Sequence, residues 1–215
     1  MKLFDGIIFD IDGTLTSTNE LIFASFNHVT EKYLGKTYTD EELISFFGPP
    51  EDDILRDLMG ENYKAAHKDY FDFYNSNHSS LADLYPGIKE VLEIIKTANI
   101  PLAVFTGKGQ RAATITLKLL EIYDYFDLIV TGDDVKKHKP APEGILMFID
   151  KFHLDKNKVL LIGDAPADIK AARSAGIKIA SVIWDSYARE KVIQLKSDYL
   201  FHTVDELKDF MAKVI

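Results

Sequence analysis

Two aspartates that could do carboxylate chemistry, Asp10 and Asp12, stand one residue apart before Gly13. They follow the apolar run Gly6-Ile7-Ile8-Phe9, which predicts a buried parallel strand that ends in a glycine turn. On a nearly extended chain the two side chains point to opposite sides. One can therefore be an ionised nucleophile or metal ligand, and the other a proton donor and acceptor. A plain turn with a helix cap is the alternative interpretation.

Thr106 and Gly107 follow a second apolar run, and Lys139 precedes Pro140 farther along the chain. The hydroxyl and the unhindered backbone N–H of Thr106-Gly107 suit phosphate oxygens, although an ordinary helix N-terminus would look the same. Proline keeps the Lys139 backbone extended, so its ammonium could reach a transferred phosphoryl group. Three neighbours are interpreted as solvated surface residues, namely Lys136, Lys137 and His138.

A third polar segment, Gly163-Asp164-Ala165-Pro166-Ala167-Asp168, follows a wholly apolar run. The carboxyl ends of parallel strands meet at one edge of a sheet, so we expect Asp164 and Asp168 to lie near Asp10 and Asp12. Carboxylate oxygens with water completing the shell are typical of a Mg²⁺ site. Asp168 alone could be only a helix N-cap, and within the set we expect it to be both.

Composition excludes several classes of site. The 215 residues carry 25 Lys plus Arg against 34 Asp plus Glu, a net charge of −9, which argues against a nucleic-acid partner. An acidic chain that handles an anionic substrate needs a bound cation, a lysine or backbone N–H groups at the site. The absence of cysteine excludes thiolate catalysis, disulfides and zinc–sulfur sites. No signal peptide and no membrane span is recognisable, so we expect a cytoplasmic protein.

Alternating strand and helix patterns organise the second part of the chain. We expect strands at 100–105, 126–130, 159–162, 177–182 and, at an edge, 197–201, with helices at 88–97, 110–123, 142–152 and 168–175 and a final helix to Val214. This order predicts an α/β fold with a Rossmann-like parallel sheet. Residues 16–82 are instead predicted to be successive helices without a strand, with an aromatic stripe that we interpret as core.

The helical block predicts an inserted cap domain, residues 16–82, within a core domain made of residues 1–15 and 83–215. Hinges near residues 16–18 and 82–85 would let the cap rock over the sheet edge and shelter a water-sensitive reaction. At its entrance Asn19, Glu20 and the turn at Gly48 are candidates for substrate contact. A purely structural role for these three residues is the alternative.

Four strand ends that carry Asp-x-Asp, Thr106, Lys139 and Gly-Asp-x-x-x-Asp resemble the four motifs of haloacid dehalogenase superfamily phosphatases. The helical insertion resembles that family's small cap. The resemblance implies that Asp10 forms an aspartyl-phosphate, that Asp12 protonates the leaving group and later activates water, and that Thr106 and Lys139 hold the phosphoryl group, with Gly107 beside them.

The same resemblance implies a Mg²⁺ cofactor. Its ligands would be the carboxylates of Asp10 and Asp164 and the backbone carbonyl of Asp12, with Asp168 acting mainly through water on the metal. Ala165 departs from the small hydroxyl or amide residue that relatives often have, and we expect this change to tune the site without loss of activity. The presence of Asp12 argues against the dehalogenase branch, which needs no proton donor there.

Looser patterns at residues 18–22, 47–50 and 182–184 resemble the phosphoglycolate phosphatase group, which includes bacterial inorganic pyrophosphatases. The expected enzyme is thus a Mg²⁺-dependent hydrolase of a small phosphorylated metabolite, phosphoglycolate phosphatase-like, with pyrophosphate as the alternative substrate. The motifs are also compatible with a phosphosugar mutase of the β-phosphoglucomutase kind and with a non-catalytic phosphate-binding module. We expect no nucleic-acid or membrane partner, and the sequence is compatible with a monomer or a homodimer.

Overall fold

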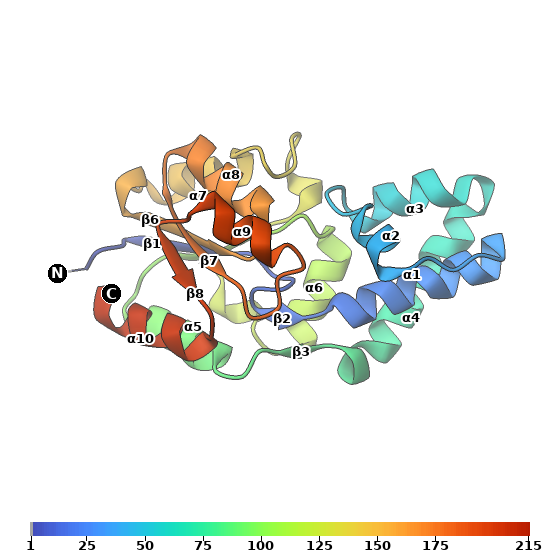
Figure 1. The fold of residues 1–215 in the computed structure, drawn as a ribbon, viewed down its shortest axis with the longest axis horizontal. Helices are drawn as coiled ribbons and strands as arrows, with labels where there is room; N and C mark the ends of the chain where they lie inside the picture. Colours follow the sequence, from blue (N-terminus) through green and yellow to red (C-terminus); the bar gives the residue numbers. More distant parts are fainter. Residues whose placement is uncertain (1) are drawn as a thin grey trace.

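The computed structural model describes residues 2–215, and Met1, the first residue of the predicted core domain, lies outside that range. Over residues 2–215 six strands form one parallel sheet in the order β5-β4-β1-β6-β7-β8. Strand β1 (Gly6–Phe9) is flanked by β4 (Leu102–Phe105) and β6 (Val159–Gly163). The prediction of an α/β fold with a parallel sheet is confirmed (Figure 1).

The remaining elements of this part of the chain follow in the predicted alternation. The strands are β5 (Leu128–Val130), β7 (Lys178–Val182) and β8 (Tyr199–Phe201). The helices are α5 (Ile88–Thr97), α6 (Gln110–Leu119), α7 (Glu143–Phe152), α8 (Pro166–Ala175), α9 (Arg189–Leu195) and α10 (Val204–Val214). Between residues 2 and 215, no helix combines the length and the apolar character needed to cross a bilayer.

Helices cover both faces of the sheet because successive strand residues point in opposite directions. Ile7 and Phe9 of β1 belong to a hydrophobic cluster with residues of α5, α6 and α10, whereas Ile8 packs with residues of α7, α8 and α9. All three side chains are fully buried. Figure 1 shows α5 and α10 below the sheet and α7 and α8 above it. The two layers hold β1 rigidly, so the residues that follow Phe9 start from a fixed backbone.

In the sequence, a separate group of helices comes after β1 and before the other strands of the six-stranded sheet. Figure 1 shows that this group extends to one side of the sheet. It consists of α1 (Asn19–Leu34), α2 (Asp40–Ile44), α3 (Glu51–Met59) and α4 (Tyr63–Leu81). These helices share their own hydrophobic cluster, in which Tyr70 and Tyr74 are fully buried. Phe71 of the same helix is also buried, whereas Phe73 is only partly buried. We call α1–α4 the helical segment.

A two-stranded ribbon joins the helical segment to the sheet, so the prediction of no strand within residues 16–82 is wrong. Strand β2 (Thr16–Ser17) pairs antiparallel with β3 (Asp83–Leu84), with Thr16 opposite Leu84 and Ser17 opposite Asp83. The two connections between the helical segment and the six-stranded sheet therefore lie side by side. Two residues per strand are too few for an alternating pattern to stand out in the sequence.

Two helix predictions also needed correction. Helix α6 ends at Leu119, four residues before the predicted end at residue 123, because Glu121 takes a left-handed conformation with φ of +57° and the N–H of Ile122 turns back to the Leu117 carbonyl. Helix α9 was not predicted. Val192 is its buried residue, so its sequence shows no apolar stripe.

Gly144, in the first turn of α7, lets that helix approach β4 closely. A Cβ built there would lie 2.4 Å from the ring of the buried Phe105. We expect Gly144→Ala to lower the free energy of unfolding by about 1–3 kcal/mol, because the ring cannot move aside without disturbing the core. Urea unfolding measures this loss. Leu146→Ala, at a position 42% exposed on the same helix, is the control and should change stability by less than about 0.5 kcal/mol. Equal effects would contradict the close-packing argument.

Candidate active site

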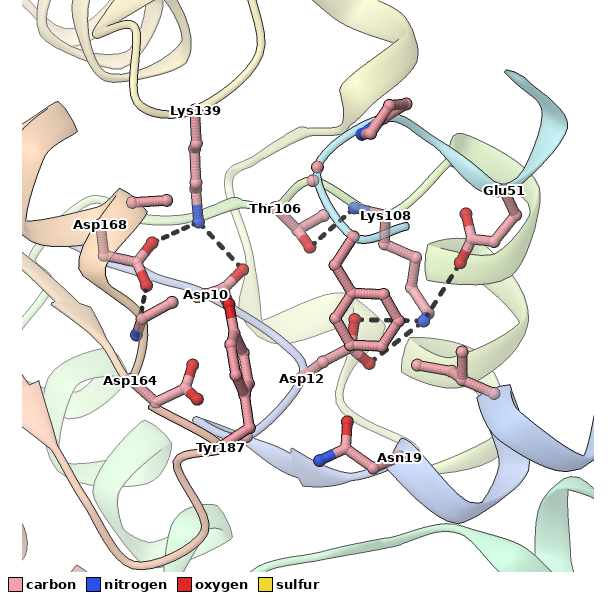
Figure 2. A pocket seen from close by; sticks show the side chains of 18 of the residues that line it. Asp10, Asp12, Asn19, Glu51, Thr106, Lys108, Lys139, Asp164, Asp168 and Tyr187 are labelled. Carbon is pink, nitrogen blue, oxygen red and sulfur yellow. Dashed lines mark hydrogen bonds and ion pairs between the residues drawn. The ribbon is translucent and has the colours of Figure 1, made fainter. Parts of the chain in front are cut away.

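A cavity of about 230 Å³ lies at the carboxyl edge of the sheet, where the strand ends meet the helical segment (Figure 2). The predicted site residues that line it are Asp10, Asp12, Asn19, Gly48, Thr106, Gly107, Lys139, Asp164 and Asp168. Glu20 does not line it, and its side chain on α1 is exposed. The structure thus gathers the polar residues of four strand ends and leaves Glu20 outside.

Asp10 follows β1 directly and continues its pairing, because its N–H donates to the Ile162 carbonyl at 2.9 Å. The chain then turns at Gly13, whose φ of +74° favours glycine. A Cβ on Gly13 would lie 2.5 Å from Oδ2 of Asp164. Glycine is therefore required both for the turn and for its close approach to the Asp164 carboxylate.

Lys139 lies between two of the clustered carboxylates. Its Nζ is 2.6 Å from Oδ1 of Asp168 and 3.0 Å from Oδ1 of Asp10, with the lysine side chain 8% exposed. The second oxygen of Asp168 accepts the N–H of Ala165 at 3.0 Å, so Asp168 caps α8 while it holds the lysine. The carboxylates of Asp10 and Asp168 thus share one ammonium, and Asp164 lies beside them.

The crowding of like charges changes the pKa values of these groups. Burial, reinforced by Asp168 and Asp12 and opposed by Lys139, raises the pKa of Asp10 to about 6. Burial, together with Asp10 and Asp168, raises the pKa of Asp164 well above its usual range. Burial alone would lower the pKa of Lys139, but Asp10 and Asp168 outweigh it and raise the pKa. The lysine is therefore a permanent cation within an excess of negative charge.

Thr106 and Gly107 present polar groups at the end of β4. The N–H of Thr106 donates to the Val130 carbonyl at 3.0 Å, and its buried hydroxyl accepts the N–H of Lys108 at 3.2 Å. Gly107 faces the helical segment, since a Cβ there would lie 3.5 Å from the Gly48 carbonyl oxygen. Both residues line the cavity beside Lys139, where the phosphoryl group is predicted to lie.

Lys108 and Glu51 are two buried charged residues at the cavity that sequence reasoning missed. Lys108 Nζ lies 3.1 Å from each carboxylate oxygen of Asp12 and 3.3 Å from Oε1 of Glu51. The Thr18 hydroxyl also donates to Asp12. Lys108 directly follows Thr106-Gly107 in the sequence, and this position could have indicated that it lies at the cavity. Nothing in the sequence marks Glu51, which comes from α3 of the helical segment.

The acidic cluster fits a divalent cation. Oxygen atoms of Asp10, Asp164 and Asp168 all lie within 4.8 Å of one another. With Lys139 the four side chains carry a net charge of −2 when ionised. Oδ1 of Asp10 is buried and lies 3.0 Å from Lys139 Nζ. Hard oxygen donors and an excess of carboxylates over cations are the properties of a Mg²⁺ site.

Aromatic rings from the two parts of the chain meet beside the cavity. Phe47 of the helical segment and Tyr187 of the loop before α9 both line it, and their rings pack edge to face with centroids 6.1 Å apart. Burial and the nearby Asp164 raise the pKa of Tyr187 to about 12, so the phenol stays neutral. Both rings thus form part of the wall of the cavity that holds the carboxylates.

The chain matches known proteins along most of its length. A family model described as haloacid dehalogenase-like hydrolase matches residues 7–182. A protein of Caldanaerobacter subterraneus subsp. tengcongensis whose name includes "pyrophosphatase PpaX" is 35% identical over 201 residues, covering 94% of this chain and 91% of the relative.

Solved structures share the fold. The crystal structure of a predicted phosphoglycolate phosphatase from Haemophilus somnus has a TM-score of 0.85 at 24% identity and covers 98% of this chain and 99% of its own. A Thermotoga maritima protein whose description includes "beta-phosphoglucomutase" has a TM-score of 0.77 at 30% identity, covering 99% of this chain and 100% of its own. The first of these likenesses concerns the fold alone.

Proposed function

The chain belongs to the haloacid dehalogenase-like hydrolase family, and we propose that it hydrolyses a small phosphorylated compound with Mg²⁺ through a phosphoryl group carried on Asp10. The observation that carries the proposal is the juxtaposition of the Asp10 carboxylate with the Lys139 ammonium and two further buried carboxylates. A cavity of about 230 Å³ supports a small substrate. We assign residues 16–82 as the cap domain over a core of residues 1–15 and 83–215.

In the first half of the reaction a carboxylate oxygen of Asp10 attacks phosphorus, and the bond to the leaving oxygen breaks. Asp12 gives its proton to that oxygen, so the leaving group departs neutralised. Lys139, the Thr106 hydroxyl and the Gly107 N–H hold the phosphoryl oxygens in place. The product of this half is a phosphoryl group bound covalently to Asp10.

In the second half water attacks phosphorus and the bond between phosphorus and the Asp10 oxygen breaks. The Asp12 carboxylate takes the proton of that water, which returns both aspartates to their starting state. The cap, with Phe47 against Tyr187, keeps bulk water away from the rest of the site. Its closure therefore limits hydrolysis to the water that Asp12 activates.

Mg²⁺ would be held by Asp10, Asp164 and the Asp12 backbone carbonyl, with Asp168 nearby. When bound, it supplies positive charge that screens the repulsion between the anionic nucleophile and the anionic phosphate. The excess of three carboxylates over the one ammonium of Lys139 supports a divalent rather than a monovalent ion.

Inorganic pyrophosphate is the first substrate to test, since the Caldanaerobacter relative bears the name pyrophosphatase. Phosphoglycolate is the second, supported by the sequence patterns at the cap entrance. A mutase activity has the support of the Thermotoga likeness alone. With Mg²⁺ bound, the site would suit the phosphoryl group of all three substrates, so the choice depends on measurement.

With Mg²⁺, we expect kcat/KM for phosphate release to be at least tenfold higher for pyrophosphate than for phosphoglycolate. After chelation of the metal by EDTA, we expect no phosphate release. A phosphate-release assay over both compounds and a panel of phosphorylated metabolites measures this. Conversion of β-glucose 1-phosphate to glucose 6-phosphate, followed with a coupled dehydrogenase, is the comparison for a mutase. Absence of turnover on the whole panel with Mg²⁺ would refute the proposed hydrolase.

A further inference from the structure

Lys108 is a buried cation that the proposed chemistry does not yet use. It belongs to the core loop before α6, and its side chain is 1% exposed. Its Nζ has acceptors on both sides: the two oxygens of Asp12, each at 3.1 Å, and Oε1 of Glu51 at 3.3 Å. Figure 2 shows the ammonium between these two carboxylates, apart from the Lys139 cluster.

Glu51 reaches Lys108 from the other domain. It stands at the first position of α3 in the cap, and its side chain is 7% exposed. Its second oxygen accepts the N–H of Gly109 at 2.6 Å, so a cap residue satisfies a backbone donor at the start of the core helix α6. Glu51 makes both contacts only while the cap lies against the core.

Lys108 could either bind an anionic group of the substrate or orient Asp12, and the contacts of its ammonium distinguish these two roles. A lysine has three N–H donors, and here three carboxylate oxygens lie within 3.3 Å of Nζ. The ammonium thus faces protein carboxylates, with its hydrogen bond donated to Oδ2 of Asp12. The lysine is therefore placed to orient Asp12, and Glu51 is placed to hold the lysine.

We propose that Glu51, Lys108 and Asp12 form an ionic relay by which cap closure orients the proton donor. With Glu51 docked, Lys108 has a single position and fixes the Asp12 carboxylate towards the leaving group. With the cap lifted, Lys108 loses one of its two carboxylate partners and Asp12 loses that orientation. Lys108 and Glu51 are positioning residues, and the proposal rests on the function proposed above for Asp12.

The test is the dependence of kcat/KM on the leaving group, measured with saturating Mg²⁺. A misplaced proton donor matters for propyl phosphate, whose alkoxide needs a proton, and matters little for 4-nitrophenyl phosphate, whose phenolate leaves without one. We expect Lys108→Met and Glu51→Gln each to lower kcat/KM for propyl phosphate about 100-fold, and to lower it less than tenfold for 4-nitrophenyl phosphate. Lys108→Arg, which keeps the charge, should recover part of the loss.

The double variant tests the relay itself. Because both residues act on Asp12 through one chain of contacts, Lys108→Met combined with Glu51→Gln should be no worse than Lys108→Met alone. Asp53→Asn, which alters a half-exposed carboxylate on the same helix, is the matched control and should leave the leaving-group dependence unchanged.

Three results would overturn the relay. The first is an equal loss of kcat/KM for both esters. The second is a loss in the double variant equal to the product of the losses in the two single variants. The third is a raised KM for pyrophosphate with unchanged leaving-group dependence, which would make Lys108 a substrate-binding residue. Failure of the proposed function looks different. In that case Asp10→Asn would still hydrolyse 4-nitrophenyl phosphate, whatever the relay variants do.

Discussion

Asp10→Asn is expected to lower kcat/KM by about 10⁴-fold or more for every phosphorylated substrate. An amide oxygen is a far weaker nucleophile than a carboxylate, and removal of a covalent nucleophile costs on the order of 10⁴ to 10⁶ in rate. The substitution keeps the shape of the side chain and its ladder hydrogen bond to Ile162. Phosphate release measures the loss, and mass spectrometry after acid quenching should find a phosphoryl adduct on the wild-type chain alone.

Asp5→Asn is the matched control for this prediction. Asp5 lies just before the other end of β1, where its carboxylate pairs with Lys158 on the surface and is 41% exposed. The control should retain wild-type kcat/KM, since a surface ion pair contributes little. Activity of Asp10→Asn equal to that of Asp5→Asn would exclude catalysis through an aspartyl-phosphate.

Lys139→Met is expected to reduce both activity and stability. The carboxylates of Asp10 and Asp168 lose the ammonium that they contact, and the cluster loses its positive charge. Removal of one partner from a buried ion pair typically costs about 3–5 kcal/mol, and loss of a transition-state cation costs about 10²–10³ in kcat. Urea unfolding and phosphate release measure the two effects. Mg²⁺ should restore more stability to the variant than to the wild type, because the variant has more uncompensated negative charge.

Lys136→Met provides the comparison within the same loop. Lys136 is exposed, so its loss should change neither the free energy of unfolding nor kcat by more than a small factor. If Lys139→Met unfolds at the same urea concentration as Lys136→Met, both without Mg²⁺, the charge argument for the cluster is wrong.

The strand-end residues could be predicted because their positions follow from chain topology alone. Asp10, Thr106 and Asp164 each come directly after a buried apolar run, and parallel strands bring such positions to one edge. Lys139 was found because a proline fixes the backbone beside it. Helix α5 was predicted with its observed bounds, since its apolar residues at Ile88, Val91, Leu92 and Ile95 repeat with helical spacing.

The contacts between the helical segment and the rest of the chain could not be predicted in the same way. Glu51 and Lys108 are 57 residues apart (108 − 51), one in α3 of the helical segment and the other in the loop before α6, so their contact depends on how the helical segment packs against the sheet side. No period or turn rule describes that docking. The same applies to Thr18, which precedes α1 but makes no side-chain cap hydrogen bond and instead donates to Asp12. This hydrogen bond is set by tertiary contact, which no local pattern describes.

The ribbon of β2 and β3 has a consequence for how such enzymes can be recombined. Thr16 and Leu84 are paired neighbours, so the chain leaves and re-enters the sheet domain at adjacent points. Partners in an antiparallel pair lie about 5 Å apart, and a turn of about two to four residues can bridge that gap. A graft of the helical segment from another family member must match this one covalent junction, and it must also supply the side chains that contact the sheet side, such as Glu51 against Lys108. The covalent connection alone is thus no obstacle to exchanging the segment, whereas these contacts decide whether the graft docks.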